Sequence, residues 1–318
     1  MNKWGRLIRE WMLPAAIVLG ISLYLMYHFT GALHPYGKWL HLAASEGQRV
    51  VIAILLFFQF VKISPHDLQF KSWHLKALAL QVGLFLLFTL GVLFTESGST
   101  LCMLLECAML CFICPTASAA GVITDRLGGH LAGTVTYLVI INLAGTFLIP
   151  LVIPLVNPSV QMGFWAYVGH LALQVFPVLI LPGLLAWLVR YTLPRLQRRL
   201  MRWASNSFYI WGVGLTLAMV LSTRALLLSH LGPWAFGGIV VISVLSCALQ
   251  FFTGHRMQKD AVDNLTAGQA LGQKNTGFLI WLGYNYMTPV TSVAGGLYAI
   301  WQNLYNSWEL YRKEQEKL

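Results

Sequence analysis

Long apolar stretches alternate with short polar segments along the whole chain. A helix rises about 1.5 Å per residue, so about 20 apolar residues cross the ~30 Å hydrocarbon core of a bilayer. The pattern predicts ten membrane-spanning helices, at residues 11–30, 49–60, 75–94, 100–123, 131–153, 164–190, 208–228, 234–253, 262–281 and 288–308. The second stretch is short, and its start could lie nearer Ala43. We therefore expect an all-α polytopic membrane protein.

Two of these spans, the fourth and the ninth, are interrupted near the middle. Residues 114–121 read Cys-Pro-Thr-Ala-Ser-Ala-Ala-Gly, and residues 272–277 read Gly-Gln-Lys-Asn-Thr-Gly. Proline removes a helical N–H group and glycine weakens a helix, so both segments should leave backbone groups free at membrane depth. Lipid cannot satisfy such groups, and paired interruptions in two halves of a chain are typical of a transporter binding site.

The position of the two breaks predicts two inverted five-helix repeats, in which the broken helices cross. Residues 1–190 would hold the first repeat, spans 1 to 5, and the start of the second repeat, span 6. Residues 191–205 would form a basic cytoplasmic linker, and residues 206–318 would hold the remaining spans, 7 to 10. Half-helix ends would then meet near the midplane, where N-terminal ends favour anions and C-terminal ends favour cations.

Composition and charge agree with a place in a membrane. Hydrophobic residues make up 57% of the 318 residues, charged residues only 10%, and the mean hydropathy is +0.66. All but four of the 21 Lys and Arg residues fall on one side of the predicted spans, which predicts cytoplasmic N- and C-termini in the cell inner (plasma) membrane. The exceptions are Lys38 and Arg49 outside, and Arg224 and Lys274 within spans; we expect Arg224 to reach outward to the interface.

The same distribution argues against several other classes of protein. The net charge of +10 is spread over many loops and forms no basic stripe, so we expect contact with membrane lipid and no nucleic acid. Cys111 and Cys114 form a C-x-x-C pair, but no His or carboxylate lies at ligand spacing, so we expect no metal. No nucleophile with a base and no phosphate-binding loop is visible, so we expect no enzyme, no cofactor and no obligatory protein partner.

Four motifs resemble those of a known family, the bile acid:sodium symporters in their bacterial ten-span form. The first break with its following residues, 114–124, resembles the family sequence C-P-G-G-T-A-S-N-V-x-T, and the second break resembles G-M-Q-N-S-G. Residues 298–304 are similar to the closing S-x-W-H-N motif, and residues 61–68 are similar to the turn between the second and third spans. The resemblance implies a core domain with crossed helices, a flanking panel domain, and alternating access to a cavity between them.

The chain departs from the family where sodium is bound. Aligned without gaps, the family's Ser, Asn and Glu ligands fall on Ala120, Gly121 and Ala270, and a Gln ligand becomes Lys274. Gln81 and Thr134 remain as a residual ion site or coupling site, together with Lys274. A hard cation needs several oxygen ligands, so the resemblance implies a transporter that works without sodium, in which Lys274 replaces the sodium charge. Proton coupling through Lys274 stays open.

The substrate implied by the resemblance is a small organic anion, such as a bile acid, pantoate or a keto acid. The predicted substrate-binding residues flank the breaks: Lys274, Asn275, Thr276, Gln273, Thr116 and Ser118. Alternatively, the polar side chains cap the unwound helix ends, and Lys274 pairs structurally or reaches the interface. Glu106 precedes Pro115 by ~13 Å of helix, so we expect it to form a gate or a structural hydrogen bond rather than to pair with Lys274.

Two alternative functions remain at this stage. One is a non-transporting membrane sensor or receptor on the same fold. Residues 309–318 argue against it, because we expect a bare cytoplasmic tail there, with no output domain. The other is a conventional sodium symporter with relocated ion ligands.

Overall fold

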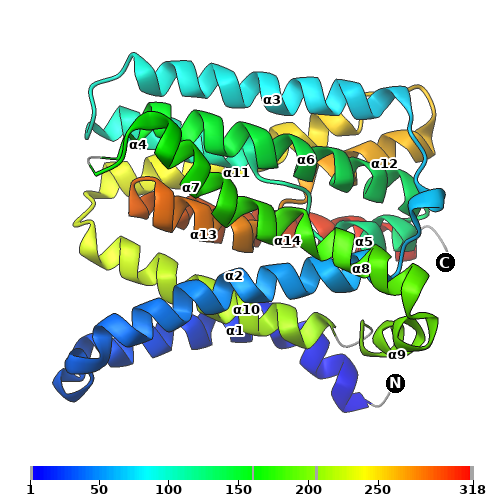
Figure 1. Cartoon of the computed structure of the whole chain (residues 1–318), viewed down its shortest axis with the longest axis horizontal. Coiled ribbons are helices and arrows are strands. Elements are labelled where there is room, and N and C mark those ends of the chain that lie inside the picture. The colour runs from blue at the N-terminus through cyan, green and yellow to red at the C-terminus, as the bar shows by residue number, and fades with distance from the viewer. Residues whose placement is uncertain (1–2, 160, 205–206, 316–318) are drawn as a thin grey trace.

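The computed structural model describes residues 3–159, 161–204 and 207–315, and within these ranges the chain is helical, with no β-strand (Figure 1). The helices are α1 (Lys3–Phe29), η1 (Gly31–Tyr36), α2 (Gly37–Val61), η2 (Pro65–Asp67), α3 (Ser72–Leu93), α4 (Thr100–Ile113), α5 (Ala120–Leu127), α6 (Leu131–Val156), α7 (Phe164–Leu179), α8 (Leu181–Thr192), α9 (Pro194–Ala204), α10 (Ser207–Leu228), α11 (Pro233–Gly254), α12 (Ala261–Gly272), α13 (Thr276–Tyr286), η3 (Pro289–Thr291) and α14 (Ser292–Gln315).

Five helices of the described chain are long and apolar enough to cross a membrane. They are Gly31–Val61, Ser72–Leu93, Leu131–Val156, Tyr209–Leu228 and Pro233–Gly254. A sixth span results if α7 and α8 count together, although they are bent by 42°. Large apolar side chains also cover the outside of the bundle, for example Leu173, which is 75% exposed, and Leu87, which is 59% exposed. A surface of this kind suits lipid, so the chain has the character of an α-helical membrane protein.

Proline explains the bend between α7 and α8. Pro182 stands in the first turn of α8 and lacks the N–H that would continue the hydrogen-bond ladder of α7. The predicted span 164–190 is therefore two helices, which the apolar pattern alone does not reveal.

The helices divide into two groups in Figure 1. Helix α10 packs against both α1 and α2, and these three helices form the lower layer, with α8 packed on α2. Above them, the main cluster of buried apolar side chains is built mostly from α4, α6, α7, α11, α13 and α14, and α2 of the lower layer also contributes to it. The start of α1 and the end of α14 lie at the same end of the bundle, on the right in Figure 1.

Two predicted boundaries differ from the structure. The predicted second span, 49–60, is only the last part of α2, which runs from Gly37 to Val61. The earlier turns of α2 carry Lys38 and Glu46, so their sequence is too polar for the apolar pattern to include them although they are helical. The basic linker 191–205 is mostly a helix, α9, whose arginines and apolar residues lie on opposite faces. Such a helix is suited to the surface of a bilayer rather than to a flexible connection.

Candidate functional site

The two interruptions predicted from the sequence meet in the structure. Helix α4 ends at Ile113 and α5 begins at Ala120, while α12 ends at Gly272 and α13 begins at Thr276. Thr116 and Lys274 form an antiparallel bridge, in which the Ala117 N–H donates to the Gln273 carbonyl at 2.9 Å and the Asn275 N–H donates to the Pro115 carbonyl at 2.8 Å. Each break thereby satisfies backbone groups that the other one frees, as burial away from water requires.

Hydrogen bonds from side chains also stabilise this crossing. The Thr116 hydroxyl donates to the Ala270 carbonyl at 2.7 Å, and Asn275 Oδ1 accepts from the Phe278 N–H and so caps α13. The Gln302 amide of α14 brackets Lys274: its Oε1 accepts from the Lys274 N–H at 2.8 Å, and its Nε2 donates to the Lys274 carbonyl at 3.2 Å. The polar residues of the breaks therefore hold the unwound helix ends together.

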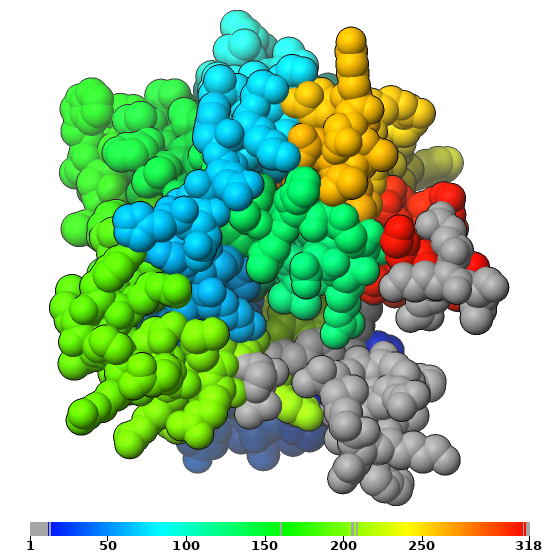
Figure 2. Space-filling view, turned by 90° about the vertical axis from the view of Figure 1, so that its right-hand side faces the viewer, coloured from blue at the N-terminus to red at the C-terminus, as the bar shows by residue number. Residues whose placement is uncertain are grey.

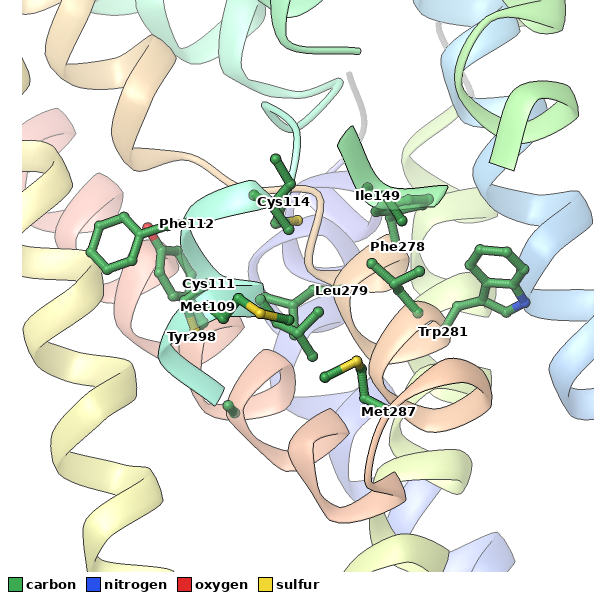
Figure 3. Close-up of a cluster of buried hydrophobic side chains, with 14 of the residues drawn as sticks. Met109, Cys111, Phe112, Cys114, Ile149, Phe278, Leu279, Trp281, Met287 and Tyr298 are labelled. Carbon is green, nitrogen blue, oxygen red and sulfur yellow. The ribbon is translucent and has the colours of Figure 1, made fainter. Parts of the chain in front are cut away.

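The Lys274 side chain is the unusual member of the crossing. It is fully buried, and its Nζ has no hydrogen-bond partner among the described residues. The thiols of Cys111, Cys114 and Cys247 are within electrostatic range of it. Cys111 lies in the last turn of α4 and Cys114 directly follows that helix, as Figure 3 shows. Through its bridge to Thr116, Lys274 lies close to the C-terminal end of α4, where a helix dipole favours a positive charge.

A second polar side chain spans the same region. Gln250 of α11 donates to the Cys111 carbonyl at 3.3 Å and to the Tyr298 hydroxyl at 3.1 Å, and that hydroxyl donates to the Gly272 carbonyl at 2.8 Å. The C-terminal carbonyls of α4 and α12 are therefore linked through one amide and one phenol. All five cysteines are buried with free thiols, and no group of three or more His, Cys, Asp or Glu in the described residues is placed to hold a metal ion.

The remaining predicted substrate residues also lie at the crossing. Gln273 is buried and donates from Nε2 to Gln269 Oε1, while Thr276 is buried in the first turn of α13. Ser118 and Asn275 are half-buried. Of the six predicted residues, these last two keep the most accessible surface.

The predicted residual ion site is not assembled by any contact in the described structure. Gln81 uses both ends of its amide: Nε2 donates to the Cys114 carbonyl at 3.0 Å, and Oε1 accepts from the Tyr137 hydroxyl at 2.8 Å. Thr134 instead donates to the Thr124 hydroxyl of α5 at 3.0 Å. Gln81 therefore supports the first break, whereas Thr134 joins α6 to α5.

Helix α2 faces both breaks with two buried amides that the sequence reasoning did not identify. A Cβ atom on Gly277 would lie 2.7 Å from Gln48 Nε2, and one on Gly121 would lie 3.3 Å from Gln59 Nε2. Gln48 is 1% exposed, and its Oε1 has no hydrogen-bond partner in the described chain. The two amides are 11 residues apart and share one helix face, a spacing that could have marked them in an apolar span.

A polar chain leads from the second break toward the end of α14. Gln273 donates to Gln269, and Gln269 Nε2 donates to Glu309 Oε2. The other carboxylate oxygen, Oε1, accepts from the Tyr305 hydroxyl at 3.2 Å and lies 3.1 Å from His255 Nε2. Glu309 was expected to begin a bare tail, but α14 continues to Gln315 and carries this carboxylate inward.

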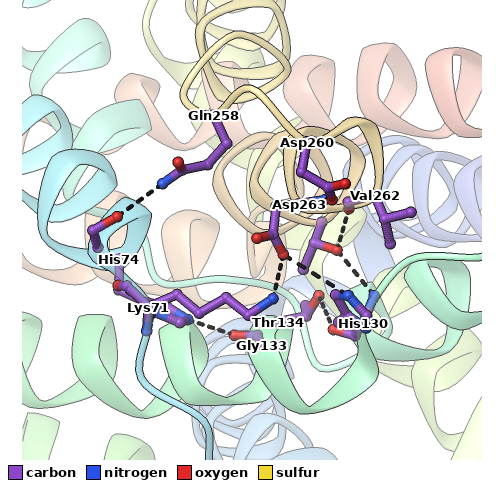
Figure 4. Close-up of polar contacts among 11 residues, drawn as sticks. Lys71, His74, His130, Gly133, Thr134, Gln258, Asp260, Val262 and Asp263 are labelled. Atoms are coloured by element: carbon purple, nitrogen blue, oxygen red, sulfur yellow. Dashed lines mark hydrogen bonds and ion pairs between the residues drawn. The ribbon is translucent and has the colours of Figure 1, made fainter.

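Ionic and polar contacts also join the starts of α3, α6 and α12 (Figure 4). Lys71 Nζ lies 2.5 Å from Asp263 Oδ1, and His130 Nε2 lies 3.9 Å from the same oxygen. The His130 N–H donates to the Thr266 hydroxyl at 2.9 Å. These contacts hold the first turns of α12 against α3 and α6, at the end of the bundle shown in Figure 2.

Two other polar residues lie at the opposite end. Glu106 of α4 is buried, and its Oε2 has no hydrogen-bond partner in the described chain, so neither the expected gate nor the expected structural hydrogen bond is tested. Arg224, which we expect to reach outward, donates from its guanidinium to the Tyr284 hydroxyl, and His41 Nε2 lies 2.8 Å from that same oxygen. Tyr284 of α13 thereby contacts both α2 and α10 of the lower layer.

These features define the chain as an all-helical protein of membrane-protein character with two interrupted helices that cross at a buried lysine. It matches no protein-family model and no curated protein. Any closer assignment therefore rests on the motifs and on the crossing itself.

Proposed function

We propose that the chain is a secondary transporter of a small organic anion that works by alternating access in the cell inner membrane. The observation that carries the proposal is the crossing: two interrupted helices pair through an antiparallel bridge, and a fully buried ammonium lies within it. Irregular backbone at membrane depth is tolerated where protein buries it or where it lines a transport site. The motif resemblance to the bile acid:sodium symporters points the same way.

We further propose ten spans in two inverted repeats, with the broken pairs α4–α5 and α12–α13 as the fourth and ninth. The packing of the helices supports this arrangement, because contacts recur in corresponding pairs. Helix α3 packs on α4 as α11 packs on α12, α5 packs on α6 as α13 packs on α14, and α1 packs on α10 as α8 packs on α2. Such recurrence is expected of two halves related by a pseudo-two-fold axis.

The surroundings of Lys274 support transport without sodium. Lys274 pairs with Thr116 just beyond the C-terminal end of α4, where a bound cation would otherwise offset the helix dipole. The Gln81 amide already bonds the Cys114 carbonyl and the Tyr137 hydroxyl, and Ala120, Gly121 and Ala270 bring no side-chain oxygen, so few oxygens are left for an ion. Lys274 would then be a built-in cation that organises the crossing and biases the site toward anions, rather than a direct ligand of the substrate.

The substrate would bind between the crossing and the lower layer of helices. Gln48 and Gln59 face the two breaks from α2, and Ser118 and Asn275 are the most accessible of the polar residues at the breaks. Amide groups donate well to carboxylates, so this lining suits an anion whose charge Lys274 balances from behind.

Uptake into proteoliposomes tests the proposal. Labelled bile acid, pantoate and a 2-keto acid would each be supplied with sodium, potassium or choline as the external cation. We expect uptake of at least one anion, equal in the three salts, and its loss in Lys274→Gln. Uptake that needs sodium would refute the role given to Lys274, and absence of uptake for all three anions would count against an organic-anion transporter.

A further inference from the structure

An apolar cavity of about 290 Å³ lies between α11 and α14, and only these two helices line it. We call it the α11–α14 groove. Two of its lining residues, Ala248 and Trp308, are exposed, so the groove opens to the outside of the bundle. Two others, Cys247 and Phe251, are buried and form its floor. The groove therefore faces the medium that surrounds the helices, which is lipid for a chain of this character.

Two polar groups on the walls of the groove are engaged with residues that do not line it. The Trp301 indole N–H donates to the Ser243 hydroxyl at 3.0 Å, and the Tyr305 hydroxyl donates to Glu309 Oε1 at 3.2 Å. Water occupies a cavity only where polar partners hold it, and an empty apolar cavity loses dispersion contacts along its whole lining. A hydrocarbon chain is therefore the occupant that suits the groove.

Two arginines stacked on aromatic rings lie at one end of the groove. Arg256 follows α11, and its guanidinium carbon lies 3.3 Å from the centroid of the Phe252 ring. Arg312 lies one turn beyond Trp308 in α14, and its guanidinium carbon lies 5.1 Å from the centroid of that ring. Both arginines are exposed. A guanidinium on an aromatic face keeps its charge, and the donors on its planar edge match the geometry of a phosphate group.

A second cavity, of about 210 Å³, lies next to the groove at the end of the bundle that faces the viewer in Figure 2. It is polar where the groove is apolar, since His255, Glu309, Arg312 and Lys313 line it. Arg312 connects the two cavities, because it lines the polar one and stacks on a wall of the groove. The Glu309 carboxylate accepts hydrogen bonds at both oxygens and so already has partners. An apolar groove that leads to a cationic end is complementary to an amphipathic anion.

We propose that the α11–α14 groove binds an anionic glycerophospholipid, with an acyl chain in the groove and the phosphate at the arginine end. Basic pockets between membrane helices bind anionic headgroups in this way, whereas the lack of net charge on a zwitterionic headgroup leaves the cationic end unbalanced. The lipid would brace α11 against α14 directly behind the crossing, where Gln250 of α11 donates to the Tyr298 hydroxyl of α14 at 3.1 Å. Lipid binding does not depend on the transport function proposed above.

Native mass spectrometry of the detergent-solubilised full-length protein tests the proposal. Phosphatidylglycerol is the probe, and phosphatidylcholine with the same acyl chains is the comparison. We expect tighter binding of phosphatidylglycerol, and no competition from glycerol phosphate, which has the charge but no acyl chain. Arg256→Gln combined with Arg312→Gln should weaken phosphatidylglycerol binding about 30-fold, because each basic residue near a lipid surface contributes roughly a factor of five. Ala248→Phe should abolish binding, because the new ring fills the groove.

Two matched controls separate this groove from general attraction to lipid. Arg195→Gln combined with Arg199→Gln removes the same charge from exposed positions of α9, and Val241→Phe adds the same ring to an exposed position of α11 that does not line the groove. Both proteins should keep the wild-type affinity. Circular dichroism checks that each variant is folded, and the arginine variant decides if Ala248→Phe is not.

Three results would overturn the proposal. One is equal binding of the two lipids, and another is wild-type affinity for phosphatidylglycerol in the Arg256 and Arg312 variant or in a folded Ala248→Phe protein. The third is an equal loss of affinity in the α9 variant, which would show attraction to the basic surface as a whole. Because no transported anion enters the measurement, each of these results would leave the transport proposal standing.

Discussion

Replacing Lys274 with methionine should make the protein more stable and, on the proposed function, inactive. The two side chains have similar length, so the apolar stem keeps its packing. Burying an ammonium at membrane depth costs ~2.5–3.5 kcal/mol, and its interaction with the C-terminal end of α4 offsets up to ~2 kcal/mol of that cost. Since Nζ has no hydrogen-bond partner in the described chain, we expect the free energy of unfolding to rise by about 0.5–1.5 kcal/mol.

Equilibrium unfolding in mixed micelles, followed by tryptophan fluorescence, measures this change. Lys38→Met is the matched control, because Lys38 is exposed and its replacement should alter stability by less than ~0.5 kcal/mol. Anion uptake by the same Lys274→Met protein should be lost although the protein is more stable. Functional groups often lower stability where they are needed for activity. A Lys274→Met protein that is less stable than wild type by more than ~1 kcal/mol would refute the reasoning, because it would mean that the ammonium is well satisfied where it lies.

Three further outcomes are expected. Thr116→Val should lower the free energy of unfolding by about 1–3 kcal/mol, because it leaves the Ala270 carbonyl buried without its hydroxyl donor. Thr192→Val, on an exposed helix face, is the control and should have little effect in the same thermal-unfolding measurement. Gly254→Ala should cost about 1–3 kcal/mol, because its Cβ would lie 2.6 Å from Gly268 Cα and force α11 away from α12, while Gly237→Ala in the same helix meets open space. Thermal stability should be the same in sodium, potassium and choline chloride, and a stabilisation specific to sodium would contradict the proposed absence of a sodium site.

The sequence predicted the class of fold and the two breaks because both follow from local chemistry. Runs of apolar residues indicate burial or contact with lipid, and Pro115 and Gly272 indicate places where a helix ends. The structure ends α4 and α12 at these places. The number of spans does not follow from local chemistry alone, because interrupted or partly polar helices such as α4 and α14 do not have the length and apolarity of a single crossing.

Other parts of the site depend on contacts that no local pattern encodes. The partner of each break lies in the other half of the chain, and although the spacing of Gln48 and Gln59 places them on one helix face, no local pattern shows that this face meets the glycines of the breaks. Glu309 follows the last apolar turn, so its polarity suggested solvent, whereas an additional turn of α14 brings it against Gln269. The roles of these residues follow from packing between helices.

The bridge at the crossing also has a consequence for the order in which the protein can be assembled. Thr116 and Ala270 are 154 residues apart, so a nascent chain that has inserted only its first half carries a proline break whose backbone partners have not yet been made. Unpaired backbone groups cost several kcal/mol each in hydrocarbon. The first half should therefore stay incompletely folded, and accessible to cellular proteases, until α12 and α13 have been inserted. Chains truncated before α12 should be degraded rather than accumulate.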